Sequence, residues 1–351
     1  MFQPEDGINL VKSGADARII SMQGRFVLKF GKALISVQAD SEKLLKPLSH
    51  YLRDHLVDSG SVEAEIDLYL KKILSPIPTH ARLALRYYAI KVFYLAGTIY
   101  FTDFQSYLTL EPGGKKVTGY ISPETLEGNE IHFFTDTFFT LVLLEMLRHQ
   151  GVFSLHSAGL ISPEQKAYLF PASGGEGKST LAIYLIREGY QFISDDIIFL
   201  TRDSGKVRVL GFKKLSHISD EAMGQFPELS ALKNAPSLDG KGKKIVDLDR
   251  VYPGQRAEQI TGEYVIIFPK KISNGASRLQ PVTQVEGFNL LLSQTPLAFI
   301  DPALAQGHFN IIRDLIHSSQ LWILESGKDW MDHPAILKDL LAQAGRGRAK
   351  G

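Results

Sequence analysis

Cysteine is absent from the 351 residues of the chain, which excludes a disulfide framework and any thiolate metal site. An excess of one charge is absent as well, because 39 Lys and Arg residues stand against 38 Asp and Glu residues. A dedicated nucleic-acid-binding protein normally has a strong basic excess, so we expect no nucleic-acid partner.

A long, uninterrupted apolar run is also lacking. The N-terminal stretch MFQPEDGINLVKSGADARII has acidic residues early and no apolar core beside basic residues, so it does not predict a signal peptide. The most apolar run, from His132 to Gly151, contains Asp136 and Glu145 and is short for a membrane span, which indicates a mostly buried helix. We therefore expect a cytoplasmic protein without a membrane partner.

The composition that is present, with 44% hydrophobic residues, predicts a sizeable packed core and leaves room for two domains. We expect an N-terminal α+β domain over residues 1–130. Strands are predicted within 17–38 and in a meander across 83–120, with a helix between them that begins after Ser41 and ends before Gly60. No motif typical of catalysis occurs in this part.

Residues 131–345 predict a second domain, of the α/β class. A helix over about 134–149 leads into a region where strands and helices alternate, the pattern of a three-layer α/β core. Further strands are expected over about 205–215 and 244–249. Residues 346–351 form a basic tail that we expect to be disordered.

The first motif with a chemical meaning is PASGGEGKST, which begins at Pro171. A phosphate-binding loop normally reads Gly, four residues, then Gly-Lys-Ser/Thr, and here Ala172 replaces the first glycine. An apolar strand, YLF, precedes the loop and an amphipathic helix, LAIYLI, follows it, so backbone N–H groups and a helix N-terminus can meet a triphosphate. A glycine-rich turn with an unrelated lysine is the alternative. The expected nucleotide-binding residues are Ser173, Gly174, Gly175, Glu176, Gly177, Lys178, Ser179 and Thr180.

An acidic pair, Asp195 and Asp196, follows in QFISDDIIFL, on the strand after the loop helix. Two adjacent carboxylates in an apolar strand are costly unless they are paired or bind a cation, and a magnesium-bound triphosphate would supply that cation. One Asp can hold the metal while the other accepts a proton from an attacking hydroxyl, but the residues alone do not assign the two roles. The alternative is a strand that ends at Ser194, with both Asp residues in a solvated turn.

Taken together, these residues resemble the HPr kinase/phosphorylase-like superfamily, whose P-loop nucleotide-binding core is related to that of phosphoenolpyruvate carboxykinase. The resemblance covers about 151–200 and depends on His156 in SLHSAGL, the loop SGGEGKST, the helix end REG and the strand FISDDIIFL. It implies an α/β P-loop core that uses ATP and Mg²⁺.

The resemblance also implies roles for individual residues. Lys178 would contact the β- and γ-phosphates, and Asp195 would be the catalytic base. Ser179 and Asp196 would hold the metal. His156 would act in catalysis by lying against the acidic pair and influencing its charge.

The signature Glu-x-Arg-Gly-Leu-Gly of true HPr kinases is missing, and VLGFKKLSHISDEAMGQFPEL stands in its place. The chain therefore looks closer to the peptide-serine kinase branch associated with lasso-peptide pathways. This implies a kinase that transfers the γ-phosphoryl group to a hydroxyl, foremost a serine of a peptide or small protein. Hexamers are usual among HPr kinases, so a homo-oligomer is a possible state.

Two other functions remain open on the sequence. One is a small-metabolite kinase, and the other is a non-catalytic nucleotide-binding scaffold or sensor, which the replacement of the first loop glycine by Ala172 faintly favours. Lys213, Lys214 and His217 fit the substrate side of a site or a solvated strand edge equally well. Lys241, Lys243 and Lys244 could close over phosphates, although a solvated surface loop is preferred. Arg256 and Arg278 could contact a transferring phosphoryl group, but nothing in the spacing selects either one, and ordinary surface charge is preferred.

Overall fold

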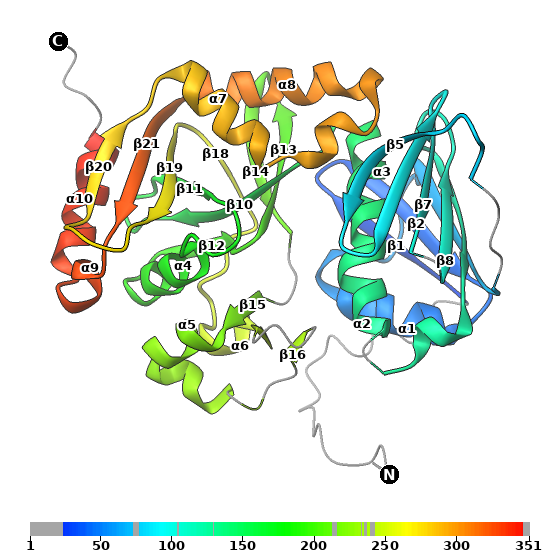
Figure 1. The fold of residues 1–351 in the computed structure, drawn as a ribbon, viewed down its shortest axis with the longest axis horizontal. Coiled ribbons are helices and arrows are strands. Elements are labelled where there is room, and N and C mark those ends of the chain that lie inside the picture. The colour runs from blue at the N-terminus through cyan, green and yellow to red at the C-terminus, as the bar shows by residue number, and fades with distance from the viewer. Residues whose placement is uncertain are drawn as a thin grey trace.

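The computed structural model describes residues 24–72, 77–103, 105–128, 130–212, 216–232, 234, 237–238 and 243–346. Within these ranges the chain is a mixed α/β protein with two nine-stranded mixed sheets and one three-stranded sheet (Figure 1). The predictions for residues 17–23, Lys213, Lys214, Lys241 and the tail 347–351 fall outside the described residues.

The first sheet has the strand order β3-β1-β2-β4-β9-β8-β7-β6-β5. Strands β5 to β9 form the antiparallel meander that the sequence predicted, and β2, β4 and β9 run parallel to one another. The strands are β1 (Arg25–Phe30), β2 (Ala33–Ala39), β3 (Leu56–Val57), β4 (Ala64–Leu70), β5 (Arg82–Tyr87), β6 (Ile90–Leu95), β7 (Thr98–Thr102), β8 (Ser106–Leu110) and β9 (Lys116–Ile121).

Helix α1 (Glu42–Tyr51) packs on the first sheet and begins as predicted, because the Ser41 hydroxyl accepts a hydrogen bond from the backbone N–H of Lys43. The prediction that it continues almost to Gly60 was wrong. The chain leaves the helix at Leu52, passes through the 3₁₀ turn η2 (Arg53–His55) and enters the sheet as β3, which pairs with β1.

The predicted buried helix is confirmed, in three segments. These are α2 (Glu130–His132), the π-helix η4 (Phe133–Phe139) and α3 (Thr140–His149), of which residues 140–148 are all buried. Among the described residues no helix is long and apolar enough to cross a membrane.

The second sheet has the order β18-β14-β13-β10-β11-β19-β21-β20, and β12 also pairs with β10. Strands β11, β19 and β21 are parallel, and the other pairs are antiparallel. The strands are β10 (Phe153–Ile161), β11 (Ala167–Pro171), β12 (Gln191–Ser194), β13 (Ile197–Asp203), β14 (Lys206–Gly211), β18 (Gln259–Thr261), β19 (Tyr264–Lys271), β20 (Arg278–Pro281) and β21 (Ser319–Ser326).

Helices cover both faces of the second sheet, which confirms the predicted three-layer arrangement (Figure 1). Alternate residues of β11 point to opposite layers, with Tyr168 and Phe170 on one side and Ala167 and Leu169 on the other. The helices of the first layer are α4 (Lys178–Arg187), α9 (Asp329–Asp332) and α10 (Ala335–Arg346), and those of the second are α7 (Gln284–Ser293) and α8 (Pro302–His317).

A three-stranded sheet in the order β15-β17-β16 lies below the second sheet in Figure 1. It contains the strand predicted near 244–249, which begins at Lys243 and gives way to a helix at Leu248. The elements here are β15 (Ser216–Ser219), α5 (Asp220–Gln225), η5 (Pro227–Leu232), β16 (Ser237–Leu238), β17 (Lys243–Val246) and α6 (Leu248–Val251).

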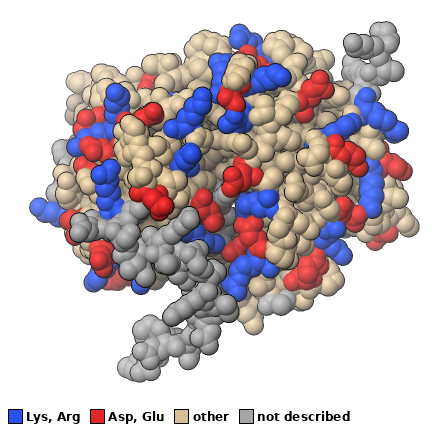
Figure 2. Space-filling view, turned by 180° about the vertical axis from the view of Figure 1, so that it is seen from behind, with Lys and Arg blue, Asp and Glu red and all other residues tan. Residues whose placement is uncertain are grey.

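The two large sheets share a hydrophobic core. Phe199 of β13 and Phe212 after β14 belong to the same buried cluster as the strands of the first sheet, and Phe30 contacts both rings. The division of the chain at residue 130 stays a prediction, although α3, which it assigned to the second domain, packs in the cluster of the first sheet. On the face drawn in Figure 2, basic and acidic side chains are interspersed, in keeping with the near-zero net charge.

Candidate functional site

The predicted glycine loop connects β11 to α4 at the middle of the second sheet. Strand β11 ends at Pro171 and α4 begins at Lys178, so the strand–loop–helix setting of the motif is present. Gly175 and Gly177 have φ values of +95° and +86°, a left-handed backbone that favours glycine. The first turn of α4 therefore opens into the loop with its backbone N–H groups available for an anion.

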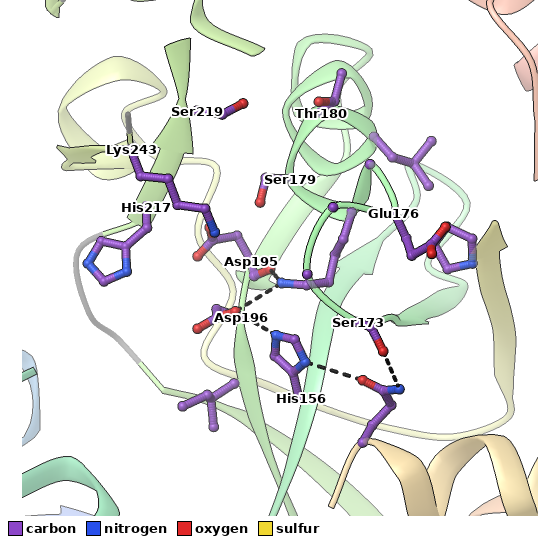
Figure 3. Close-up of a pocket in the computed structure, with 18 of the residues that line it drawn as sticks. His156, Ser173, Glu176, Ser179, Thr180, Asp195, Asp196, His217, Ser219 and Lys243 are labelled. Carbon is purple, nitrogen blue, oxygen red and sulfur yellow. Dashed lines mark hydrogen bonds and ion pairs between the residues drawn. The ribbon is translucent and has the colours of Figure 1, made fainter. Parts of the chain in front are cut away.

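Lys178 connects the loop to the acidic pair. Its side chain is only 7% exposed. The ammonium donates to the backbone oxygen of Asp195 and lies 3.1 Å from Oδ1 of Asp196 (Figure 3). A buried cation of this kind is held where it can turn to phosphate oxygens bound by the loop.

The expectation that the acidic pair lies within a continuous strand was wrong. The strand ends at Ser194, as in the alternative interpretation, but Asp195 is buried and not solvated. Strand β12 ends at Ser194 and β13 begins at Ile197, so both Asp residues lie in a bend. Strand β10 pairs with both flanking strands, through Gly159 opposite Ser194 and His156 opposite Ile197. The bend removes the strict alternation of a strand, so the backbone oxygen of Asp195 and the carboxylate of Asp196 both contact Lys178.

The two Asp residues have different surroundings. The Asp196 side chain is about one-third exposed, and its Oδ1 contacts both Lys178 and His156. Asp195 is 5% exposed and lines the cavity beside the loop, and no side chain in the described ranges forms an ion pair with its carboxylate. A buried carboxylate without such a partner is suited to a cation or a proton that arrives with a ligand.

His156 lies in a hydrogen-bonded chain that joins the acidic pair to the start of the loop. Its Nε2 is 3.0 Å from Asp196 Oδ1, and its Nδ1 is 3.3 Å from Oε1 of Gln294. The Gln294 amide nitrogen donates to the Ser173 hydroxyl at 3.3 Å (Figure 3). Both ring nitrogens of His156 therefore lie within hydrogen-bonding distance of a side-chain oxygen, which fixes the orientation of the ring.

Gln294 was missed by the sequence analysis, because it lies far along the chain, just after α7, in a stretch without a recognisable motif. Its backbone oxygen also accepts a hydrogen bond from the His156 N–H. The contact arises from the packing of α7 against the sheet and leaves no local signal in the sequence.

A cavity of about 870 Å³ surrounds these groups, and all eight predicted nucleotide-binding residues line it. Glu176 has a structural part as well, because its carboxylate accepts from the Lys271 N–H at the end of β19 and so fixes the tip of the loop. The three-stranded sheet contributes His217 and Lys243, two of the basic candidates (Figure 3).

The other described basic candidates do not line the cavity. Arg256 pairs with Asp249 at 2.7 Å and lies over the ring of Phe192, and Arg278 pairs with Glu325 at 2.5 Å. Both arginines are therefore occupied elsewhere by carboxylates.

The residues present fit a magnesium-bound nucleotide triphosphate. The loop offers N–H donors, Lys178 offers a cation, and Ser179 and the two Asp residues offer oxygen ligands. No group of three or more His, Asp or Glu among the described residues could hold a metal unaided. Magnesium typically binds through one or two carboxylates together with substrate phosphates, so the metal would bind along with the nucleotide.

Comparisons with known proteins do not establish a family for this chain. No protein-family model matches the chain, and no curated protein matches it. Among solved structures, the chain is similar to the Hpr(Ser) kinase/phosphatase from Coxiella burnetii, at 12% sequence identity and a TM-score of 0.28, over 54% of this chain and 94% of that one. At this identity and TM-score, the likeness assigns no activity to this chain.

Proposed function

We propose that this protein is an ATP- and Mg²⁺-dependent phosphotransferase of the HPr kinase-like type. It would transfer the γ-phosphoryl group to a hydroxyl, foremost a serine of a peptide or small protein. The observation that carries the proposal is the buried ammonium of Lys178, held between a phosphate-binding loop and an acidic bend. Phosphoryl transfer depends mainly on positioning and charge neutralisation, and these groups supply both.

The ion pair between Lys178 and Asp196 implies an exchange of partners on nucleotide binding. Phosphate oxygens in the loop would draw the ammonium away from Asp196 and leave that carboxylate, with Ser179, for the metal. Magnesium, when bound, neutralises phosphate charge. His156 keeps Asp196 oriented through the 3.0 Å contact.

Asp195 remains for the proton. In the transfer, the bond between the acceptor oxygen and the γ-phosphorus forms, the bond from the γ-phosphorus to the bridging oxygen breaks, and ADP leaves. The hydroxyl proton passes to the Asp195 carboxylate, which lines the same cavity.

Two substitutions test this assignment. Lys178→Ala and Asp195→Asn should each lower phosphoryl transfer from labelled ATP by about 10²–10³-fold, the usual loss when one preorganised charged group is removed. Far-UV circular dichroism should show an intact fold in both. Lys166→Ala is the matched control, since this lysine lies on the surface and donates to Gly345.

The acceptor mixture for the assay contains serine peptides, sugars and small hydroxy acids, so that a small-metabolite kinase is distinguished from a peptide kinase. Unchanged transfer in both site variants would exclude the mechanism. Tight ATP binding with no turnover on any acceptor would show a nucleotide-binding scaffold instead.

A further inference from the structure

Strand β5 is an edge strand that lies beside the catalytic cavity. It is the last strand of the first sheet, and among the described residues only β6 pairs with it. Tyr87 at its end and Tyr88 in the following turn line the cavity with Leu85, and the two tyrosines are 42% and 61% exposed. The first sheet thus forms a wall of the site that contains the loop.

The outer edge of β5 offers backbone hydrogen-bonding groups. Tyr87 pairs with Ile90 across a two-residue turn, and Arg86 pairs with Lys91. The pair that closes a two-residue hairpin is normally hydrogen bonded, and antiparallel pairs alternate, so the N–H and C=O of Arg86 point to the outer edge. Such an edge is a template for an added strand.

Strand β5 lies near the part of the cavity that is lined by Asp195 and Asp196. The Arg82 guanidinium donates to the backbone oxygen of Ile300, just past η6 (Pro296–Phe299), at 3.1 Å. The segment before η6 carries Gln294, which contacts His156 beside the acidic pair. An acceptor bound at β5 would therefore approach the acidic pair from the side of the first sheet.

The charge of this hairpin favours an acidic ligand. Residues 77–102 contain Arg82, Arg86 and Lys91 but no Asp or Glu. Arg86 is exposed on β5, next to the tyrosines of the turn. Cations along an edge strand attract a segment with carboxylates and reject a basic one.

We propose that an extended acidic peptide adds as a strand to the edge of β5, with Tyr87 and Tyr88 contacting the side chains next to its acceptor serine. This inference rests on the proposed phosphotransferase function and assigns acceptor recognition to the N-terminal sheet. Backbone pairing supplies affinity in this mode, and the aromatic turn and the basic residues supply specificity.

The test uses two degenerate nonapeptide libraries, each with one central serine, one with Asp- and Glu-rich arms and one with Lys- and Arg-rich arms. N-acetylserine amide is the small acceptor. We expect the acidic library to be phosphorylated with a kcat/KM at least tenfold above that of the basic library and of the amide. Backbone N-methylation of the best peptide on one side of its serine should raise its KM by tenfold or more.

Variants of the hairpin test the same contact from the protein side. Arg86→Pro removes the outward N–H without removing a ladder hydrogen bond, so it should raise the peptide KM more than Arg86→Ala, which removes only the charge. The double variant Tyr87→Ala/Tyr88→Ala should also raise the peptide KM by about tenfold. Tyr69→Ala, an exposed tyrosine of β4, is the control that should leave the kinetics unchanged.

ATP affinity, measured with a fluorescent ATP analogue, separates the two proposals. If the wild-type protein does not bind the ATP analogue, both the proposed function and this inference are overturned. Normal ATP binding, with peptide transfer that is insensitive to the hairpin variants and to N-methylation, would overturn the β5 inference alone. Transfer to N-acetylserine amide as efficient as transfer to the acidic peptides would do the same.

Discussion

Replacing Arg148 with methionine should destabilise the protein in a pH-dependent way. Arg148 and Glu145 are fully buried on α3, and the guanidinium donates to both carboxylate oxygens at 2.7 and 2.8 Å. Its other terminal nitrogen donates to the backbone oxygen of Ala298 in η6 at 3.3 Å. The substitution keeps an apolar stem of similar length and leaves the carboxyl without its partner.

The size of this loss of stability follows from the pKa of Glu145. Burial raises this pKa from 4.5 to about 7, although the Arg148 charge acts to lower it. A carboxyl whose folded pKa is raised lowers stability as the pH rises from the unfolded to the folded value. In Arg148→Met the pKa of Glu145 in the folded state rises further. Above pH 7 the free energy of unfolding of the variant therefore continues to fall by about 1.4 kcal/mol per pH unit, whereas that of the wild type no longer falls.

The assay is urea unfolding followed by circular dichroism at pH 6 and pH 8.5. At pH 6 the Glu145 carboxyl is protonated in both proteins. The free energy of unfolding of the variant should then be about 1 kcal/mol below that of the wild type, because the hydrogen bonds of Arg148 are missing. At pH 8.5 the loss should reach about 3 kcal/mol. The double variant Arg148→Met/Glu145→Leu should lack this increase. An equal loss of stability at both pH values in Arg148→Met would show that ionisation of Glu145 is not the cause.

Three further predictions concern the loop, the core and the metal. Gly177→Ala should lower the free energy of unfolding, measured by thermal denaturation, by about 1–2 kcal/mol, because Gly177 has a positive φ. Gly174→Ala should lower it little, because Gly174 does not have a positive φ of this kind and has open space around it. Equal losses in the two variants would contradict this prediction. Burial lowers the pKa of His308 from 6.5 to about 3, so stability should fall as the pH drops between these values, and His308→Phe should flatten that limb in urea titrations. EDTA should abolish phosphoryl transfer. It should not lower the melting temperature of the nucleotide-free protein, because the described residues contain no group of three or more metal-binding side chains. A lower melting temperature would indicate a structural metal.

The glycine loop was predictable from the sequence because its parts are local. The strand before it, the positive-φ glycines and the helix after it are neighbours in the chain, so one short window contains the whole structure. The buried helix near 134–149 was predictable for the same reason, since its apolar side chains are continuous, although nothing in the pattern indicated the π-helical turns of η4.

The arrangement around the acidic pair was only partly predictable. The sequence indicates that Asp195 and Asp196 need a cation, but the bend between β12 and β13 depends on how β10 pairs with both strands. Gln294 and Tyr88 reach the cavity through contacts between segments far apart in the chain. Such contacts depend on the packing of whole layers, which no short pattern encodes.

The aromatic cluster shared by the two large sheets has a consequence for how the molecule can be divided. Phe30 and His55 come from the first sheet and its turn, and they contact Phe212 directly. A truncated chain that kept only the half with the glycine loop would expose Phe199 and Phe212 to water, so such a fragment should aggregate. Denaturation of the full chain should accordingly proceed in one cooperative step. A ligand that binds to one half should then protect the other half from proteolysis as well.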